Sequence, residues 1–195
     1  MSPLVGVLAL QGDVPEHLRS LAACGVRTAT VRTAAELRTV DALAMPGGES
    51  TTMGRLLRVF ALEQPLRERL AAGMPVLATC AGTILLSRNV LDGRADQLTF
   101  GALDIDVRRN GYGRQVDSFE ADVKPRGLDG QAFRAVFIRA PVIERIGPGV
   151  EVIAELDGRP IAIAQGPHLA LSFHPEMTGD ARLHRLFLAR AGLAA

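Results

Sequence analysis

The chain has 195 residues, 48% of them hydrophobic and 22% charged, a balance that is ordinary for a globular protein and excludes disorder. Its 22 basic and 21 acidic residues give a net charge of +1, so no nucleic-acid or membrane partner is expected. Two cysteines are too few for a disulfide framework or a cysteine-rich metal site, and no apolar run approaches the roughly 18 residues that span a bilayer. We therefore expect a single domain over residues 1–195, located in the reducing cytoplasm.

The first half of the chain alternates strands with helices. Apolar runs predict strands at residues 5–10, 26–31, 42–45 and 76–79. Between them, helices are expected from an N-cap at Asp13 to Gly25, and at residues 34–38, 51–60 and 66–72. This alternation predicts an α/β fold with right-handed βαβ crossovers and a mostly parallel central sheet flanked by helices.

A loop with two glycines, Pro46-Gly47-Gly48-Glu49-Ser50, joins the third strand to the next helix. Adjacent glycines let the backbone turn its N–H groups toward a ligand, as an oxyanion hole or an anion-binding nest requires. No Walker lysine pattern and no dinucleotide fingerprint follows, which argues against a phosphate loop. Taken alone, the loop is more simply a turn in which Glu49 and Ser50 cap the helix.

The fourth strand runs directly into Thr79-Cys80-Ala81-Gly82, after which a helix is expected. One reactive side chain between small residues, at a strand-to-helix turn, is typical of a nucleophile elbow. The helix N-terminus would also favour the thiolate form of Cys80. The alternative is that Cys80 is a small buried apolar residue, as most free cysteines are.

The second half of the chain has strands with little helix between them. The expected strands are at residues 102–107, 118–123, 135–138, 150–154, 161–164 and 169–172. They predict a mixed or antiparallel extension of the sheet, and residues 180–191 predict a closing amphipathic helix.

Two arginines stand near the ends of these strands. Arg109 lies in the polar run 108–115, where it could bind a carboxylate through a bidentate contact. Arg139 ends an apolar strand, where an unpaired charge is costly. For either arginine alone, a surface salt bridge is the simpler interpretation.

The remaining cysteine and histidines carry weaker signals. Cys24, at the end of a helix, is interpreted as a packing residue. His17 is ambiguous, whereas His168 and His184 are interpreted as surface or helix-face residues.

His174-Pro175-Glu176 follows the last apolar run. Pro175 disfavours helix at His174, so the imidazole is expected just past a strand end, with Glu176 near enough to fix its tautomer. The C-terminal ends of parallel strands share one edge of a sheet, so Cys80 and His174 are expected to meet there. The tripeptide alone is as often structural as catalytic, but with the elbow it predicts nucleophile, base and orienting carboxylate.

Together, these features resemble the class I (triad) glutamine amidotransferases. More specific strings resemble the glutaminase subunits of pyridoxal 5′-phosphate synthase: Leu10-Gln11-Gly12, and residues 46–53, 113–120 and 137–141. The resemblance runs from the first strand to residues 175–178 and implies a three-layer sandwich. Two positions depart from the family pattern, Ala78 in place of a glycine and Gly111-Tyr112 in place of a small-Phe pair.

The resemblance implies that Cys80, His174 and Glu176 hydrolyse L-glutamine to L-glutamate and ammonia, without a metal or a cofactor. The backbone N–H groups of Gly48 and Ala81 would hold the oxyanion. The positions that match glutamine-binding residues are Gly48, Glu49, Ser50, Arg109, Ile138 and Arg139. Ammonia would pass through a tunnel to a separate (β/α)₈ synthase subunit, in a complex expected to be a dodecamer of heterodimers.

Three alternatives remain. A glutaminase for another pathway, such as histidine or purine synthesis, would share the triad, but the string at residues 113–120 speaks against it. A cysteine amidase, peptidase or γ-glutamyl hydrolase could use the same scaffold with a larger substrate. A non-catalytic assembly subunit has no need of all three triad residues.

Overall fold

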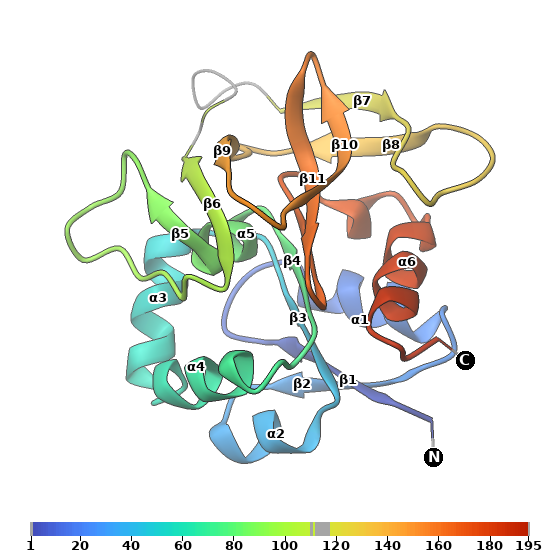
Figure 1. Ribbon diagram of the computed structural model, residues 1–195. Coiled ribbons are helices and arrows are strands. Elements are labelled where there is room, and N and C mark those ends of the chain that lie inside the picture. Colours follow the sequence, from blue (N-terminus) through green and yellow to red (C-terminus); the bar gives the residue numbers. More distant parts are fainter. Residues whose placement is uncertain (1, 110, 112–117, 195) are drawn as a thin grey trace.

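The computed structural model describes residues 2–109, 111 and 118–194 (Figure 1). Its centre is a seven-stranded sheet with the strand order β10-β11-β12-β4-β3-β1-β2. The strands are β1 (Leu4–Leu8), β2 (Arg27–Val31), β3 (Ala42–Met45), β4 (Val76–Thr79), β10 (Glu151–Leu156), β11 (Arg159–Gln165) and β12 (His168–Leu171). Strands β2, β1, β3, β4 and β12 are parallel, and β11 and β10 continue the sheet antiparallel. The predicted parallel sheet with a mixed extension is confirmed.

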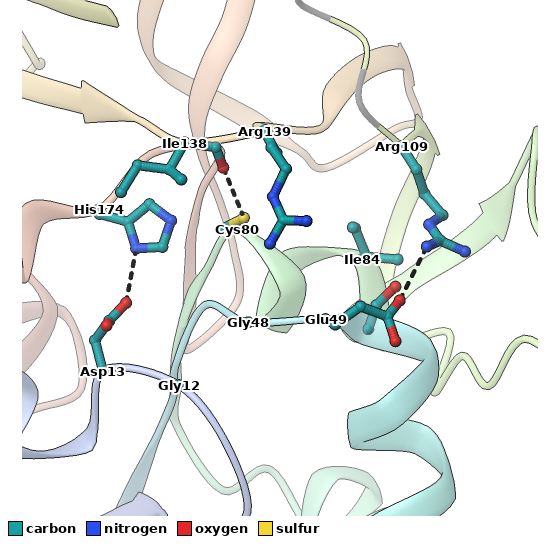
Figure 2. A pocket seen from close by; sticks show the side chains of 11 residues that line it. Gly12, Asp13, Gly48, Glu49, Cys80, Ile84, Arg109, Ile138, Arg139 and His174 are labelled. Atoms are coloured by element: carbon teal, nitrogen blue, oxygen red, sulfur yellow. Dashed lines mark hydrogen bonds and ion pairs between the residues drawn. The ribbon is translucent and has the colours of Figure 1, made fainter. Parts of the chain in front are cut away.

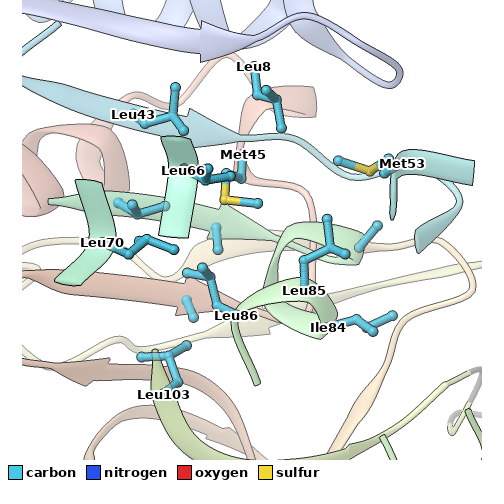
Figure 3. Close-up of a cluster of buried hydrophobic side chains, with 14 of the residues drawn as sticks. Leu8, Leu43, Met45, Met53, Leu66, Leu70, Ile84, Leu85, Leu86 and Leu103 are labelled. Atoms are coloured by element: carbon cyan, nitrogen blue, oxygen red, sulfur yellow. The ribbon is translucent and has the colours of Figure 1, made fainter. Parts of the chain in front are cut away.

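Helices cover both faces of this sheet. They are α1 (Val14–Ala22), α2 (Ala34–Thr39), α3 (Ser50–Val59), α4 (Glu63–Ala71), α5 (Ala81–Leu86) and α6 (Arg182–Arg190). Strand β3 shows how the layers form, because its side chains alternate between two cores. Leu43 and Met45 pack with apolar residues of α2 to α5, as Figure 3 shows in part, whereas Ala42 and Ala44 pack with those of α1 and α6. The fold is therefore a three-layer sandwich.

Two smaller sheets extend from the second half of the chain. One contains β5 (Ser87–Val90), β6 (Leu103–Arg108) and β9 (Val142–Ile146), and the other pairs β7 (Phe119–Val123) with β8 (Phe133–Phe137). The sequence analysis missed β5 and β9, because both are short and carry exposed polar side chains. Strand β9 pairs antiparallel with β6, and across this pair Arg145 lies 2.7 Å from both Asp104 and Asp106.

The other predicted elements lie close to their expected positions. Helix α4 starts three residues before the predicted 66, at Glu63. Tyr112 and residues 113–117 of the family-specific string lie outside the described residues. Within the described part of the chain, the helices are all too short or too polar to cross a membrane.

Candidate active site

Cys80 occupies a tight turn between β4 and α5. Its backbone has φ +47° and ψ −104°, a conformation that is costly for any residue with a Cβ atom. Strand β12 holds the turn, because the carbonyl oxygen of Leu171 accepts hydrogen bonds from the N–H of Cys80 (2.9 Å) and from Oγ1 of Thr83 (2.7 Å). A Cβ atom on Gly82 would overlap the carbonyl oxygen of Met45 in β3. This is the geometry of a nucleophile elbow.

The family departure at Ala78 places a methyl group just before the elbow. The Ala78 side chain is fully buried in the core that also contains Met45 and Leu85. The methyl group that distinguishes Ala78 from the glycine of the family pattern is thus part of this core.

His174 and Glu176 follow β12 at the same edge of the sheet. The backbone of His174 is not helical (φ −108°, ψ 88°), in keeping with the proline after it, and its N–H donates to the carbonyl of Val136 in β8 at 2.9 Å. Nδ1 of His174 lies 2.9 Å from Oε1 of Glu176. Glu176 belongs to the short helix η1 (Pro175–Met177), and its side chain is fully buried. Sequence reasoning predicted this pair.

A pocket of about 460 Å³ lies beside Cys80 and His174 (Figure 2). All of the glutamine-binding positions suggested by the resemblance line it: Gly48, Glu49, Ser50, Arg109, Ile138 and Arg139. Gly12, Asp13 and Ile84 complete the wall and were not predicted. Glu176 lies behind His174, outside this lining. Thus the fold brings residues from six separate segments around one cavity.

The thiol and the imidazole both face this pocket. Sγ of Cys80 lies 3.8 Å from the carbonyl oxygen of Ile138, and the side chain of Cys80 is buried. Nε2 of His174 is buried and accepts or donates no hydrogen bond among the described residues. One ring nitrogen is therefore fixed by Glu176 and the other is free to move a proton.

The surroundings of His174 stabilise its charged form. Burial lowers the pKa of the imidazole, but the Asp13 carboxylate (3.3 Å from Nδ1), the Cys80 sulfur and the Glu176 carboxylate together raise that pKa well above its ordinary value. Burial likewise raises the pKa of the Glu176 carboxyl, but His17 and His174 hold it well below its usual range. Glu176 is thus an ionised acceptor for His174.

Asp13 was predicted to cap α1, and this interpretation is wrong for its side chain. Asp13 stands at the N-cap position, but its carboxylate makes no capping hydrogen bond and lies beside His174 instead. Asp13, His174 and Glu176 bring potential metal-ligand atoms within 4.8 Å of one another. A metal ion on Nδ1 would displace the proton that binds Glu176, so the arrangement fits a hydrogen-bonded imidazole better.

The other end of the pocket carries an ion pair. Arg109 lies 2.9 Å from Oε1 of Glu49 and 3.1 Å from Oγ1 of Thr51. Glu49 also caps α3, as expected, by accepting from the N–H groups of Thr51 and Thr52. Burial raises the pKa of Glu49, but hydrogen bonds from Thr52 and Thr51 lower it to about 2. Both charges are therefore present at neutral pH.

Arg139 points into the same pocket from the segment after β8 (Figure 2). Its backbone is in the left-handed region (φ +46°), which is uncommon for a residue other than glycine. Such strain often marks a functional site, because the surrounding structure must hold it.

The glycine loop packs closely on this site. Gly48 has φ +149°, and a Cβ atom on Gly47 would overlap the ring of His174. Gln11 lies in the segment after β1, and its Oε1 accepts a hydrogen bond from the N–H of Glu49 at 3.1 Å, which ties this segment to the glycine loop. Ala81 is the first residue of α5, where N–H groups lack partners within the helix.

Comparisons with known proteins identify the family of this chain. A solved structure described as a glutamine amidotransferase has a TM-score of 0.90 and 48% identity, covering 96% of this chain and 98% of its own. PurLQS from Thermotoga maritima shares the fold alone, with a TM-score of 0.65 and 14% identity over 100% of this chain and 95% of its own. The chain matches the SNO glutamine amidotransferase family over residues 7–192 and belongs to it. The family resemblance read from the sequence is confirmed.

Two curated relatives carry a more particular name. Pyridoxal 5′-phosphate synthase subunit PdxT of Parafrankia sp. (strain EAN1pec) is 58% identical over 187 residues, which cover 96% of this chain and 92% of that protein. The protein of the same name from Mycobacteroides abscessus is 58% identical over 194 residues, or 98% of this chain and 100% of that protein. Both relatives match this chain over nearly its full length.

Proposed function

We propose that this chain is the glutaminase subunit of a pyridoxal 5′-phosphate synthase, which releases ammonia from L-glutamine for a partner subunit. The observation that carries the proposal is the pocket that Cys80, on its elbow, and His174 line together with the Arg109–Glu49 pair, with Glu176 behind His174. The name shared by the relatives supports the pathway. It also weighs against a glutaminase for histidine or purine synthesis.

In the proposed reaction, His174 takes the proton of Cys80, and the thiolate attacks the side-chain amide carbon of glutamine. The N–H groups of Gly48 and Ala81 hold the oxyanion of the tetrahedral intermediate. As the intermediate collapses, the C–N bond breaks and His174 gives its proton to the departing ammonia. Water, deprotonated by His174, then attacks the thioester and releases glutamate and Cys80. Glu176 orients His174 throughout.

The charges at the far end of the pocket fit the α-carbon of glutamine. Free glutamine carries a carboxylate and an ammonium group on that carbon. The guanidinium groups of Arg109 and Arg139 suit the carboxylate, and the ionised Glu49 suits the ammonium. A peptide substrate lacks this pair of free charges, so the arrangement favours free glutamine over the peptidase alternative.

Arg109→Gln is expected to raise the KM for glutamine about tenfold or more, with a smaller change in kcat, because a charged hydrogen bond contributes about 1.5–3 kcal/mol. Arg108→Gln is the matched control, since Arg108 is exposed and paired with Glu144 at 3.0 Å. Steady-state ammonia release against glutamine concentration measures both. Equal KM values for the two variants would remove Arg109 from the binding site.

The chain requires a second protein in this proposal, because ammonia released into water is protonated and lost. We propose that it docks on a (β/α)₈ synthase subunit, as one half of a heterodimer in a dodecamer of heterodimers in the cytoplasm. The docking surface is the edge of the sheet that carries Gln11, Gly12 and the Gly47-Gly48 loop, because the triad lies at that edge.

Ammonia release is expected to rise about 10²–10³-fold when the synthase subunit is added to the purified chain, which is the usual effect of gaining one oxyanion-hole donor. The Gly47-Gly48 peptide can rotate at low cost, so its N–H can turn toward Cys80 on docking. The Cys80→Ala chain with the same synthase subunit is the negative control for ammonia release. Full activity of the chain alone, unchanged by the synthase, would favour a stand-alone amidase.

A further inference from the structure

A network of buried polar side chains lies on the side of Glu176 that faces away from His174. Nε2 of His17, in α1, lies 3.4 Å from Oε2 of Glu176 and 3.3 Å from Oγ1 of Thr79. Nδ1 of His17 lies 3.2 Å from Nε2 of His184, in α6. His17, Thr79 and His184 are all fully buried. Four elements, α1, β4, η1 and α6, therefore converge on the carboxylate behind the catalytic imidazole.

The hydrogen bonds of this network come from its own members, and they leave Oε2 of Glu176 buried with no hydrogen-bond partner among the described residues, so the 3.4 Å contact of that oxygen with His17 is an electrostatic contact and not a hydrogen bond. A buried polar group without a hydrogen bond destabilises the fold, so such clusters need a reason to persist. The sequence analysis interpreted His184 as a surface or helix-face residue; it lies on α6, but on the buried face of that helix and not at the surface. The two histidines do not line the pocket, so they do not touch the substrate.

The distances determine which nitrogen atoms carry hydrogen. Glu176 is ionised, so the ring nitrogen of His17 that faces Oε2 at 3.4 Å carries a hydrogen and not a lone pair. Burial, with His17 beside it, lowers the pKa of His184 to about 3, so this imidazole is neutral. Nδ1 of His184 is buried without a partner among the described residues. Because a buried N–H without an acceptor is rarer than a bare lone pair, the hydrogen of His184 belongs on Nε2.

With these assignments, the hydrogen bonds of the network all donate in one direction, toward the Glu176 carboxylate. Nε2–H of His184 donates to Nδ1 of His17, and Nε2–H of His17 then points at Oε2 of Glu176 and at Thr79. Nδ1–H of His174 donates to the other oxygen of the same carboxylate. The opposite tautomer of His17 would set a nitrogen lone pair against the carboxylate and leave Nδ1–H of His184 unpaired.

We propose that His17 is a positioning residue of the active site. Its Nε2, 3.4 Å from Oε2 of Glu176, attracts the carboxylate electrostatically and so keeps the other oxygen against His174, in the orientation and tautomer that the reaction needs. The inference rests on the proposed function, in which Glu176 orients His174. His17 acts only through Glu176. Its loss should therefore lower kcat and leave the affinity for glutamine nearly unchanged.

Two substitutions of His17 separate this role from packing. The amide nitrogen of glutamine reaches the position of Nε2, whereas the amide of asparagine reaches only the position of Nδ1. His17→Asn is expected to lower kcat about 10- to 100-fold, the usual effect of removing an outer group that orients a side chain of the active site, with KM within about twofold. His17→Gln is expected to restore kcat to within about threefold of the parent chain. Both are assayed with the synthase subunit present.

A double-mutant cycle with Glu176→Gln tests whether His17 acts through the carboxylate. In the Glu176→Gln chain, adding His17→Asn is expected to lower kcat by no more than about twofold, because the group that it positions is already altered. Thermal unfolding checks that each variant folds. If His17→Asn does not fold, His17→Phe, which keeps the ring volume without nitrogen atoms, replaces it in both comparisons.

Four outcomes would overturn the proposal. Equal loss of kcat in His17→Asn and His17→Gln, or additive effects of His17→Asn and Glu176→Gln, would make His17 a packing residue and leave the proposed triad intact. Unchanged kcat in His17→Asn would show that Glu176 is held without it. Parental kcat in Glu176→Gln itself would instead overturn the role of Glu176, and with it that of His17.

Discussion

Cys80→Ala is expected to lower ammonia release from glutamine by at least about 10⁴-fold while the chain remains folded, because no other group can form the thioester. The substitution removes a buried sulfur whose recorded hydrogen bond, to the carbonyl of Ile138, is a weak one at 3.8 Å. The new methyl group keeps the Cβ atom that the strained backbone already carries. Ammonia release with the synthase subunit present, together with the thermal unfolding midpoint, measures both effects.

The second cysteine is the internal control. Cys24 lies at the end of α1, where its thiol donates to the carbonyl of Ser20 at 3.2 Å, and burial raises its pKa. A glutamine-like electrophile should therefore label Cys80 and spare Cys24, and Cys24→Ala should keep parental activity. Equal labelling of the two thiols, or activity retained in Cys80→Ala, would contradict the assignment of the nucleophile.

The parts of this site that the sequence predicted are set by local chemistry. A nucleophile elbow needs small residues around one reactive side chain, so Cys80 stands out without any knowledge of distant contacts. Pro175 fixes the backbone at His174, and Glu176 is two residues away. The glycine loop is visible for the same reason, because only small residues allow close backbone approach.

The missed parts depend on contacts between distant segments. His17 and His184 are 167 positions apart, and nothing near either residue in the sequence shows that α1 and α6 pack together behind Glu176. Asp13 has the expected residue type for a helix cap, and only the position of His174 explains why its carboxylate turns away. Strand β9 was missed because its apolar pattern is limited to the buried Val142 and Ile143, and charged side chains that pair with β6 follow them.

His174→Asn is expected to be nearly inactive, with a loss of about 10⁴-fold or more, whereas Glu176→Gln should retain measurable activity. His174 moves the proton in both halves of the proposed reaction, and an asparagine amide cannot. Glu176 only orients the imidazole and stabilises its charged form. Single-turnover and steady-state ammonia release, with the synthase subunit present, compare the two variants directly.

The structure gives a specific reason for the residual activity of Glu176→Gln. Oδ2 of Asp13 lies 3.3 Å from the same nitrogen of His174, so a second carboxylate remains beside the imidazole. We therefore expect Glu176→Gln to lose only about 10- to 100-fold in kcat, less than the loss typical for a triad carboxylate. Adding Asp13→Asn should lower kcat further, and Asp13→Asn alone should have the smaller effect, because its carboxylate is more exposed and more distant. If Glu176→Gln were less active than His174→Asn, the base and the orienting carboxylate would have been assigned the wrong way round.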